Sequence, residues 1–363
     1  MKKVLMIACT DLGIGGVQNV IMGIVRSLRS DYVFDVVVFN RTDSEYEKEI
    51  LKYGMIYDIP CRKSQNPFLQ KLEFYIRPMR IYSLAKSIMK KNGPYDVVHC
   101  NNGVEEALIL LAAKQAGIKK RIAHAHTALL VSRTKVIRRL YDWVYRKMIV
   151  QFSTIKIACS TRAGENLFGK KSDFKIIANP IDIARFVQPS SKGKMHWGII
   201  HVGNFDANKN QLFVVNVFKE IISQAPEARL TLIGGGNNMY RDAVVDKVKK
   251  LELEKFVSFL PPDTNIPDEL ARNSIFLFPS KTEGLGIALM EAQVAGLRCF
   301  ASDSVPIEAD LGNVRFFDLR LGAKVWAEEI YADITNNNIK KHIKYERVSQ
   351  KIIAEQYRDV YSS

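Results

Sequence analysis

Short β-rich runs alternate with amphipathic helical patterns along this chain, and this alternation restricts the folds that it can adopt. In the first half, the segments typical of strands are Val4–Cys9, Phe34–Phe39, Val97–Cys100, Arg121–Ala125 and Ile155–Cys159. Helical patterns such as Val17–Leu28 and Glu105–Ala116 lie between them. A strand, a crossover helix and a second strand form a parallel pair that the helix covers. The first half therefore predicts a parallel sheet with helices on its faces.

The alternation stops at residues 179–194 (NPIDIARFVQPSSKGK), where Pro, Ser and Gly indicate an interdomain linker, and then restarts. The second set of strands is predicted at Gly198–His201, Arg229–Ile233, Val257–Leu260, Ser274–Phe278 and Arg298–Ala301, with helices at Gln211–Ser223, Asp242–Leu251 and Ile287–Ala295. We predict an α/β protein with two Rossmann-like, doubly wound domains facing across a cleft, at residues 1–187 and 188–345. A helix at 346–363 should pack back toward the first domain. Ligands are expected at the carboxyl ends of the strands.

The positive charge of the chain is concentrated in its first half. Residues 1–190 hold 31 Lys and Arg against 16 Asp and Glu, whereas residues 191–363 hold 22 of each, so the first half carries the whole net charge of +15. Nucleic acid, an anionic membrane surface or an anionic substrate could each select for such a field. No apolar run reaches the roughly 18 residues that cross a bilayer, and no signal-peptide cleavage pattern follows Met1. We expect a cytoplasmic protein.

Two features of the first half suit ligand binding at strand ends. Gly15 and Gly16, in the turn TDLGIGGVQ, would let a phosphate or sugar approach the amides that begin a helix. Gln18 replaces the last glycine of a dinucleotide fingerprint, and an ordinary strand–helix turn is the alternative. His124 and His126 share a face at the end of a strand, without further ligands that would complete a metal site. His126 could act on a sugar hydroxyl or support a charged transition state, or it could be a packed core histidine.

The second half repeats this arrangement with charged residues. The segment HVGNFDANKN (201–210) ends a strand at Gly203 and places Lys209 just before a helix, where a cation could reach a pyrophosphate. A solvated loop lysine is the alternative. Gly234 opens a run of three glycines after the next strand, at the same edge of the sheet.

The segment FPSKTEGLGIALMEA (278–292) carries the strongest signal. A buried strand ends in Pro279, a glycine-bearing loop holds Glu283, and a helix carries Glu291 about one turn from its start. The amides of residues 285–288 would form an anion site. The Glu291 carboxylate could accept hydrogen bonds from two vicinal hydroxyls, such as those of a ribose.

Taken in order, these motifs resemble the retaining GT-B glycosyltransferases of family 4, and among them the bacterial exopolysaccharide and capsule transferases. The resemblance covers nearly the whole chain through GGVQ, HAHT, NPID, HVGNF with NKN, LIGGG, PSxxEGLG, E-x7-E and EAQVAG. It implies a hexosyltransferase (EC 2.4) that moves a hexose or N-acetylhexosamine from a nucleotide sugar to a lipid-linked or oligosaccharide acceptor. It also implies retention of anomeric configuration and a role in the synthesis of cell-surface polysaccharide.

The resemblance assigns roles to matching positions. His126, beside the transferred sugar, and Glu283, on the hydroxyls of the donor sugar, would be the catalytic residues. Lys209 would bind the diphosphate and Glu291 the ribose. The other donor-binding positions would be Gly15, Gly16, Gly203, Asn204, Gly234, Gly284, Leu285 and Gly286. The family usually has an arginine where Asn204 stands, so either Lys209 and the helix amides suffice or another cation, for example from the basic first domain, fills the gap.

We expect neither a metal nor a cofactor. The chain contains no D-x-D motif, through which GT-A enzymes recruit a metal. Its five cysteines are scattered without a C-x-x-C pair, which argues against a zinc cage and against a disulfide framework. The positive loop and the helix end would stabilise the charge that develops on the leaving diphosphate.

Residues 132–150 (SRTKVIRRLYDWVYRKMIV) mix cations with apolar and aromatic side chains at helical spacing. The cations are Arg133, Lys135, Arg138, Arg139, Arg146 and Lys147. Such a helix suits the headgroup layer of an anionic membrane, so we expect peripheral association with the inner face of the cell membrane and an acceptor found there. An amphipathic helix packed on its own sheet is the alternative.

Two other functions compete with this one. A non-catalytic GT-B subunit supporting a partner transferase is kept open by Asn204. A basic nucleic-acid-binding protein would explain the charge, but the cations form no recognised motif and the two glutamates would have no role. We therefore expect no nucleic acid partner.

Overall fold

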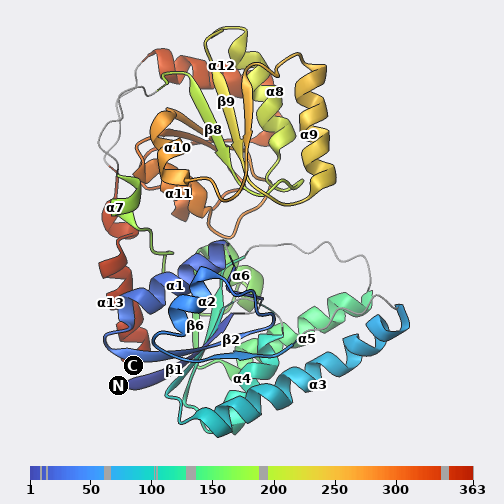
Figure 1. Cartoon of the computed structure of the whole chain (residues 1–363), viewed down its shortest axis with the longest axis vertical. Coiled ribbons are helices and arrows are strands. Elements are labelled where there is room, and N and C mark those ends of the chain that lie inside the picture. The colour runs from blue at the N-terminus through green and yellow to red at the C-terminus, as the bar shows by residue number, and fades with distance from the viewer. Residues whose placement is uncertain are drawn as a thin grey trace. The chain divides into compact units, whose positions relative to one another are not determined.

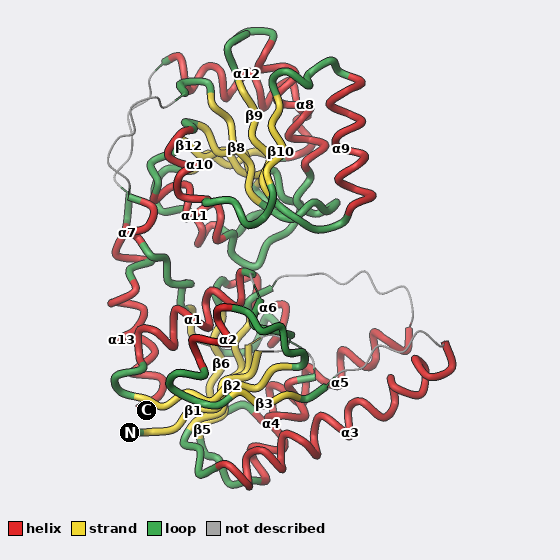
Figure 2. The backbone as a smooth tube through the Cα atoms, viewed as in Figure 1, coloured by secondary structure: helices red, strands yellow, loops and turns green. Residues whose placement is uncertain are grey.

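The computed structural model describes residues 1–8, 10–13, 15–60, 67–101, 103, 105–127, 136–187, 195–336 and 343–362, without the side chains of 67–75 and 136–138. Its contacts divide the chain into two compact units. The first unit comprises Met1–Pro180 together with Gln350–Ser363, and the second comprises Ile181–Ser349. In each unit, strands of one sheet lie among helices (Figures 1 and 2).

The first unit contains a seven-stranded parallel sheet with the order β3-β2-β1-β4-β5-β6-β7. The strands are β1 (Lys2–Ala8), β2 (Tyr32–Val38), β3 (Ile56–Asp58), β4 (Val97–Asn101), β5 (Lys120–Ala125), β6 (Ile155–Ala158) and β7 (Lys175–Ile176). The helices are α1 (Gly16–Leu28), α2 (Glu45–Ile50), α3 (Pro67–Asn92), α4 (Glu106–Gln115), α5 (Val136–Phe152), α6 (Thr161–Phe168) and α13 (Gln350–Ser362). Every residue of β4 and residues 4–8 of β1 are buried, as expected for strands covered on both faces.

The second unit contains a six-stranded parallel sheet with the order β10-β9-β8-β11-β12-β13. The strands are β8 (Gly198–Val202), β9 (Arg229–Ile233), β10 (Val257–Leu260), β11 (Ile275–Phe278), β12 (Arg298–Ser302) and β13 (Val314–Phe317). The helices are α7 (Ile183–Phe186), α8 (Gln211–Ile222), α9 (Asn238–Lys250), α10 (Ile266–Arg272), α11 (Ile287–Val294) and α12 (Gly322–Thr335), with short 3₁₀ turns at Ile307–Ala309, Leu319–Leu321 and Tyr345–Arg347. Trp326 of α12 is fully buried in the core between Phe213 and Phe317.

The predicted fold class of two parallel α/β sheets is confirmed. All ten predicted strands are present, with ends that differ by at most two residues within the described part of the chain. The units divide at 180/181 and 349/350, whereas the sequence placed the boundaries at 187/188 and 345/346. The difference arises because α7 packs against α10 and α11, and because Ile181 pairs with Ser349 in a parallel bridge. Residues 188–194 of the predicted linker lie outside the described residues.

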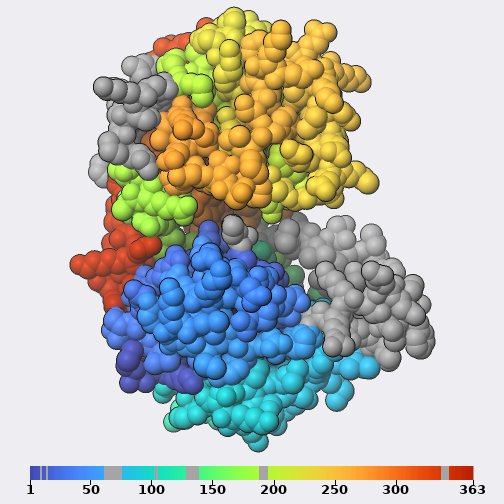
Figure 3. Space-filling view, in the orientation of Figure 1, coloured from blue at the N-terminus to red at the C-terminus, as the bar shows by residue number. Residues whose placement is uncertain are grey.

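Helix α13 packs on the first unit beside α1 (Figures 1 and 3). The hydroxyl of Tyr361 lies 2.7 Å from Nδ1 of His99, and its backbone carbonyl accepts a hydrogen bond from Lys120 Nζ at 2.8 Å. Arg358 forms an ion pair with Asp31 at 2.7 Å. Tyr361 is fully buried, so α13 completes the core of a unit whose other residues lie far away in the sequence.

No helix in the part of the chain that the structure describes has both the length and the hydropathy needed to cross a membrane. The longest of the described helices, α3, contains Pro78 and has Lys90 and Lys91 in its last turn.

Candidate functional site

The carboxyl ends of β8, β9 and β11 bring three loops to one edge of the second sheet. Backbone hydrogen bonds join the first two loops, from Gly203 N to Ile233 O at 2.9 Å and from Phe205 N to Gly235 O at 2.6 Å. The first loop also bonds to the third, from Lys281 N to Asn208 O at 2.8 Å. Residues that the sequence selected separately therefore lie together: Gly203, Asn204, Lys209, Gly234, Glu283, Gly284, Leu285 and Gly286.

Gly234 makes the approach of two of these loops possible. Its φ is +157°, and a β-carbon at this position would lie 2.2 Å from the carbonyl oxygen of Gly203. No side chain can be accommodated at that distance from a backbone atom. The edge of the sheet is thus held close-packed and is lined by backbone rather than by side chains at this point.

Lys209 lies in a turn that Asp206 stabilises, and its ammonium already forms an ion pair. The Asp206 carboxylate accepts hydrogen bonds from the amides of Asn208 at 2.8 Å and Lys209 at 2.9 Å. The Lys209 ammonium lies 2.6 Å from the Glu283 carboxylate and 5.1 Å from the centre of the Phe278 ring. The side chains of the pair are only 22% and 11% exposed. Two residues assigned to different parts of a donor therefore contact each other directly.

Helix α11 begins at this edge. Gly286 precedes it with a left-handed φ of +98°, and no side chain caps the first turn. The first amides of a helix have no partner within the helix, so these amides can receive an anion. Glu291 lies further along α11 and is half-buried. Burial raises the pKa of its carboxyl to about 7, and Arg185 on α7 acts in the opposite direction.

The side chain of Asn204, where the family usually has arginine, is exposed. Its backbone carbonyl accepts a hydrogen bond from the side-chain amide of Gln211 at 2.9 Å, which fixes the loop but supplies no charge. Arg241 of α9 lies with its guanidinium 6.0 Å from the ring of Phe205, the residue that follows Asn204. No motif in the sequence points to Arg241, because its place beside Phe205 depends on how α9 packs.

The corresponding edge of the first sheet carries Gly15 and Gly16. Gly15 precedes α1 with extended backbone, and no side chain caps the helix. The Gln18 side chain donates instead to Thr10 Oγ1 at 3.2 Å and to the Asp11 carbonyl at 3.3 Å. The turn is therefore stabilised by its own residues, and the first amides of α1 stay uncapped.

His126 follows β5 at the same edge and is buried. Its Nε2 lies 3.1 Å from Oδ1 of Asn101, whose amide nitrogen donates to the carbonyl oxygens of Ile7 and His99. Oδ1 can only accept, so Nε2 carries the proton and Nδ1 is an acceptor. No protein atom among the described residues pairs with this Nδ1. Burial lowers the pKa of His126 to about 3, so the ring is neutral at pH 7.

His126 belongs to a cluster of three buried histidines that the sequence indicated only in part. The His124 and His126 rings lie 3.8 Å apart, and His99 Nε2 lies 3.2 Å from His124 Nδ1. Burial also lowers the pKa of His99 to about 3. The Tyr361 hydroxyl contacts His99 at one end of this cluster. The cluster was not predictable from spacing, because Tyr361 lies 262 residues from His99 in the sequence.

Part of the predicted membrane-facing cluster lies on α5. Arg133, Lys135 and the side chain of Arg138 lie outside the described part. Arg139 and Lys147 are exposed, as are Leu140 at 60% and Trp143 at 58%. Arg146 instead turns inward and donates to the carbonyl oxygen of Asn166 on α6.

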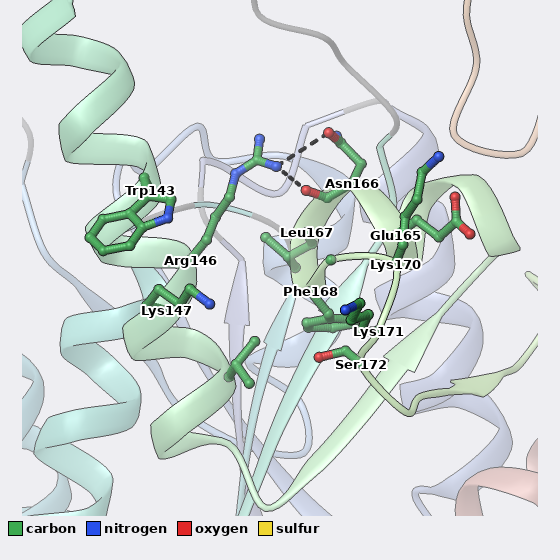
Figure 4. Close-up of a pocket in the computed structure, with 12 residues that line it drawn as sticks. Trp143, Arg146, Lys147, Glu165, Asn166, Leu167, Phe168, Lys170, Lys171 and Ser172 are labelled. Atoms are coloured by element: carbon green, nitrogen blue, oxygen red, sulfur yellow. Dashed lines mark hydrogen bonds between the residues drawn. The ribbon is translucent and has the colours of Figure 1, made fainter.

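A groove of about 410 Å³ lies between α5 and the end of α6. Figure 4 shows Trp143 and Lys147 extending from α5, with Lys170 and Lys171 following α6 on the other side. Glu165 is the carboxylate in its lining. Cations thus outnumber carboxylates here, and the groove offers an indole face beside them.

Comparison with protein families agrees with this geometry. Residues 14–185 match the model described as Glycosyltransferase Family 4, and residues 182–312 match Glycosyl transferases group 1. The chain belongs to the family 4, group 1 glycosyltransferases of GT-B type. The two matches together cover residues 14–312 and so include most of each unit of this glycosyltransferase, and the second includes Lys209, Glu283 and Glu291.

Individual relatives are similar over most of the glycosyltransferase. EpsF of Bacillus subtilis (strain 168), provisionally named a glycosyltransferase, is 27% identical over 93% of this chain and 89% of its own. The capsular polysaccharide biosynthesis glycosyltransferase CapH of Staphylococcus aureus is 28% identical over 91% and 90%. An Escherichia coli enzyme, UDP-Gal:alpha-D-GlcNAc-diphosphoundecaprenol alpha-1,3-galactosyltransferase, is 25% identical over 61% of each chain. The crystal structure of Anabaena HepE with UDP-glucose shares the fold, with a TM-score of 0.80 at 16% identity over both full chains.

Proposed function

We propose that this glycosyltransferase moves a hexose or N-acetylhexosamine from a nucleotide sugar to a lipid-linked or oligosaccharide acceptor during synthesis of a cell-surface polysaccharide. The observation that carries the proposal is the meeting of Lys209, Glu283 and the uncapped start of α11 at one edge of the second sheet. The names of CapH and of the Escherichia coli galactosyltransferase support the class of product and the lipid diphosphate acceptor.

The proposed roles follow from charge and hydrogen-bonding capacity. Lys209 and the first amides of α11 bind the diphosphate, whose negative charge grows as the sugar leaves, so they stabilise the transition state more than the ground state. Glu291 accepts the ribose hydroxyls. Glu283 accepts hydroxyls of the donor sugar and orients its ring. The sugar is transferred with retention, so the acceptor oxygen attacks from the face that the diphosphate leaves.

His126 takes part as a hydrogen-bond acceptor in this proposal. Its unpaired Nδ1 can receive a sugar hydroxyl, while its Nε2 stays fixed by Asn101. Because burial holds the pKa of the ring near 3, His126 acts through this hydrogen bond rather than as a charged imidazolium. A sugar hydroxyl at this nitrogen would satisfy a buried polar atom and fix the orientation of the ring being transferred.

A donor screen tests the proposal. Nucleoside diphosphates are ranked by thermal shift, and the matching nucleotide sugars are then assayed for hydrolysis and transfer, with and without chelator. Tight binding of one nucleotide, turnover that continues in EDTA, and loss of that turnover in Lys209→Met are expected. Turnover that requires added magnesium or manganese would contradict the expectation that sugar transfer needs no metal. Nucleotide binding without turnover on any donor would favour the non-catalytic subunit.

We also propose that the first unit binds the inner face of the cell membrane through α5. Arg139 and Lys147 provide cations beside the exposed side chains of Leu140 and Trp143, and each surface cation contributes about 1 kcal/mol of attraction to anionic lipid. This arrangement brings the protein to the site where a lipid-linked acceptor is found.

Flotation with vesicles of phosphatidylglycerol and phosphatidylcholine tests membrane binding. Charge reversal with Arg139→Glu and Lys147→Glu should lower the bound fraction about tenfold or more, and 0.5 M salt should do the same. The matched control reverses two exposed cations of the second unit, Lys249→Glu and Lys324→Glu, which should leave binding unchanged. Equal losses in both pairs of variants, or binding to neutral vesicles alone, would refute the role of α5.

A further inference from the structure

The candidate site contains its own counter-ion. Lys209 Nζ lies 2.6 Å from Glu283 Oε1, and the two side chains are 22% and 11% exposed. The loops that carry them are joined, because the Asn208 side chain donates to the Thr282 carbonyl at 2.8 Å. The Lys209 backbone is fixed by Asp206. The ion pair is therefore held in place by its surrounding loops. Lys209, the cation proposed to bind the diphosphate, already contacts Glu283.

We propose that Glu283 makes the enzyme distinguish the intact nucleotide sugar from the spent nucleoside diphosphate, by holding Lys209 whenever no sugar is bound. The inference rests on the proposed function, since it takes Lys209 as a diphosphate ligand and Glu283 as a sugar ligand. A bare nucleoside diphosphate has to draw Lys209 away from Glu283 or share it. The largely buried Glu283 carboxylate then loses its charged partner and gains none, which is unfavourable.

The intact donor meets a different situation. Its sugar presents hydroxyls that donate hydrogen bonds to Glu283 in place of the Lys209 ammonium. The carboxylate stays satisfied, and Lys209 is released to the diphosphate. The free energy lost when the ion pair breaks is therefore offset by the sugar hydroxyls when the donor binds. It is not offset when the product, which has no sugar, binds. Glu283 thus acts as a specificity-determining residue, and one consequence is weak inhibition by the product.

Calorimetric titration of the full-length protein with UDP and with UDP-glucose tests this inference, with GDP and GDP-mannose as the alternative pair of probes. Glu283→Gln keeps the shape of the side chain and removes its charge. We expect this change to raise affinity for the nucleoside diphosphate about fivefold or more, while affinity for the nucleotide sugar falls. Glu329→Gln removes a carboxylate that pairs with Arg315 at 2.8 Å, and as the matched control it should change neither affinity.

A double-mutant cycle then isolates the ion pair. In the Lys209→Met background, Glu283→Gln should change nucleoside diphosphate affinity less than about twofold, because no cation remains to be released. An equal gain in both backgrounds would mean that Glu283 only repels the phosphate, and would overturn the inference. Unchanged or weaker diphosphate binding in Glu283→Gln would overturn it too, with the proposed function intact if UDP-glucose or GDP-mannose binds the wild type. If no nucleoside diphosphate or nucleotide sugar of the donor screen binds the wild type, both fail together.

Discussion

Lowering the pH from 8 to 6 should weaken binding of the nucleotide sugar about tenfold, because Glu291 changes its charge in this range. Burial raises the pKa of its carboxyl to about 7, and Arg185 on α7 acts against the increase. In the role proposed for Glu291, the ribose hydroxyls donate hydrogen bonds to the ionised carboxylate, so binding selects that form. Affinity therefore rises as the pH rises through 7 and falls as it drops below.

The magnitude follows from the fraction of protein that is ionised. With a pKa of about 7, about nine tenths of the Glu291 carboxyls are charged at pH 8 and about one tenth at pH 6. The apparent dissociation constant varies inversely with the competent fraction, which gives the tenfold change. His126 and His201 do not contribute between pH 6 and 8, because burial lowers their pKa values to about 3 and 4.

Calorimetry with UDP-glucose at pH 6, 7 and 8 measures this effect. A nucleotide sugar is preferable to UDP, whose terminal phosphate itself titrates near pH 6. Repeating the titration at pH 7 in two buffers of different ionisation enthalpy should show release of about half a proton per ligand. Glu291→Gln should bind weakly with a flat pH profile. A flat profile for the wild type, or tighter binding at pH 6, would refute the role assigned to Glu291.

Four further changes have defined outcomes. Glu291→Gln should raise the free energy of unfolding, measured in urea, by up to about 3 kcal/mol at pH 8 and by little at pH 4.5. The reason is that the raised pKa of Glu291 makes the wild-type fold lose stability as the pH rises from about 4.5 to 7. Gly234→Ala should weaken UDP binding and lower the unfolding midpoint, since its β-carbon would lie 2.2 Å from the neighbouring carbonyl oxygen. Tyr361→Phe should cost about 1–2 kcal/mol in urea unfolding by leaving His99 Nδ1 unpaired, with donor affinity unchanged in calorimetry. Arg241→Met should reduce UDP affinity in calorimetry if this cation replaces the arginine missing at position 204, and equal affinity would exclude that role.

The sheets were predictable because parallel strands covered on both faces are apolar at nearly every position. β1 and β11 show this pattern, and their ends could be predicted within two residues. The short edge strands β3, β7 and β13 were not predicted. Edge strands have one partner and are partly exposed, as the burial of β13 and β7 shows, so their sequences carry no continuous apolar run.

The site was predictable to the extent that it follows from strand ends. Lys209 and Glu283 could be placed at the same sheet edge, because both follow strands of one parallel sheet. Their ion pair could not, since it joins loops 74 residues apart and depends on the register between them. The raised pKa of Glu291 also depends on burial that no local pattern reveals.

The return of α13 to the first unit affects how the protein is made. On the ribosome, Ile181–Ser349, about 170 residues, emerge after β7 and before α13. At a translation rate of about 5–20 residues per second, roughly 10–30 s pass before Tyr361 is available to cover His99 and Tyr32. The nascent first unit is therefore incomplete while the whole second unit is translated and can fold. A fragment that stops at Pro180 would stay in that state. The first unit should be obtainable alone only when α13 is supplied in trans or joined by circular permutation to Lys2.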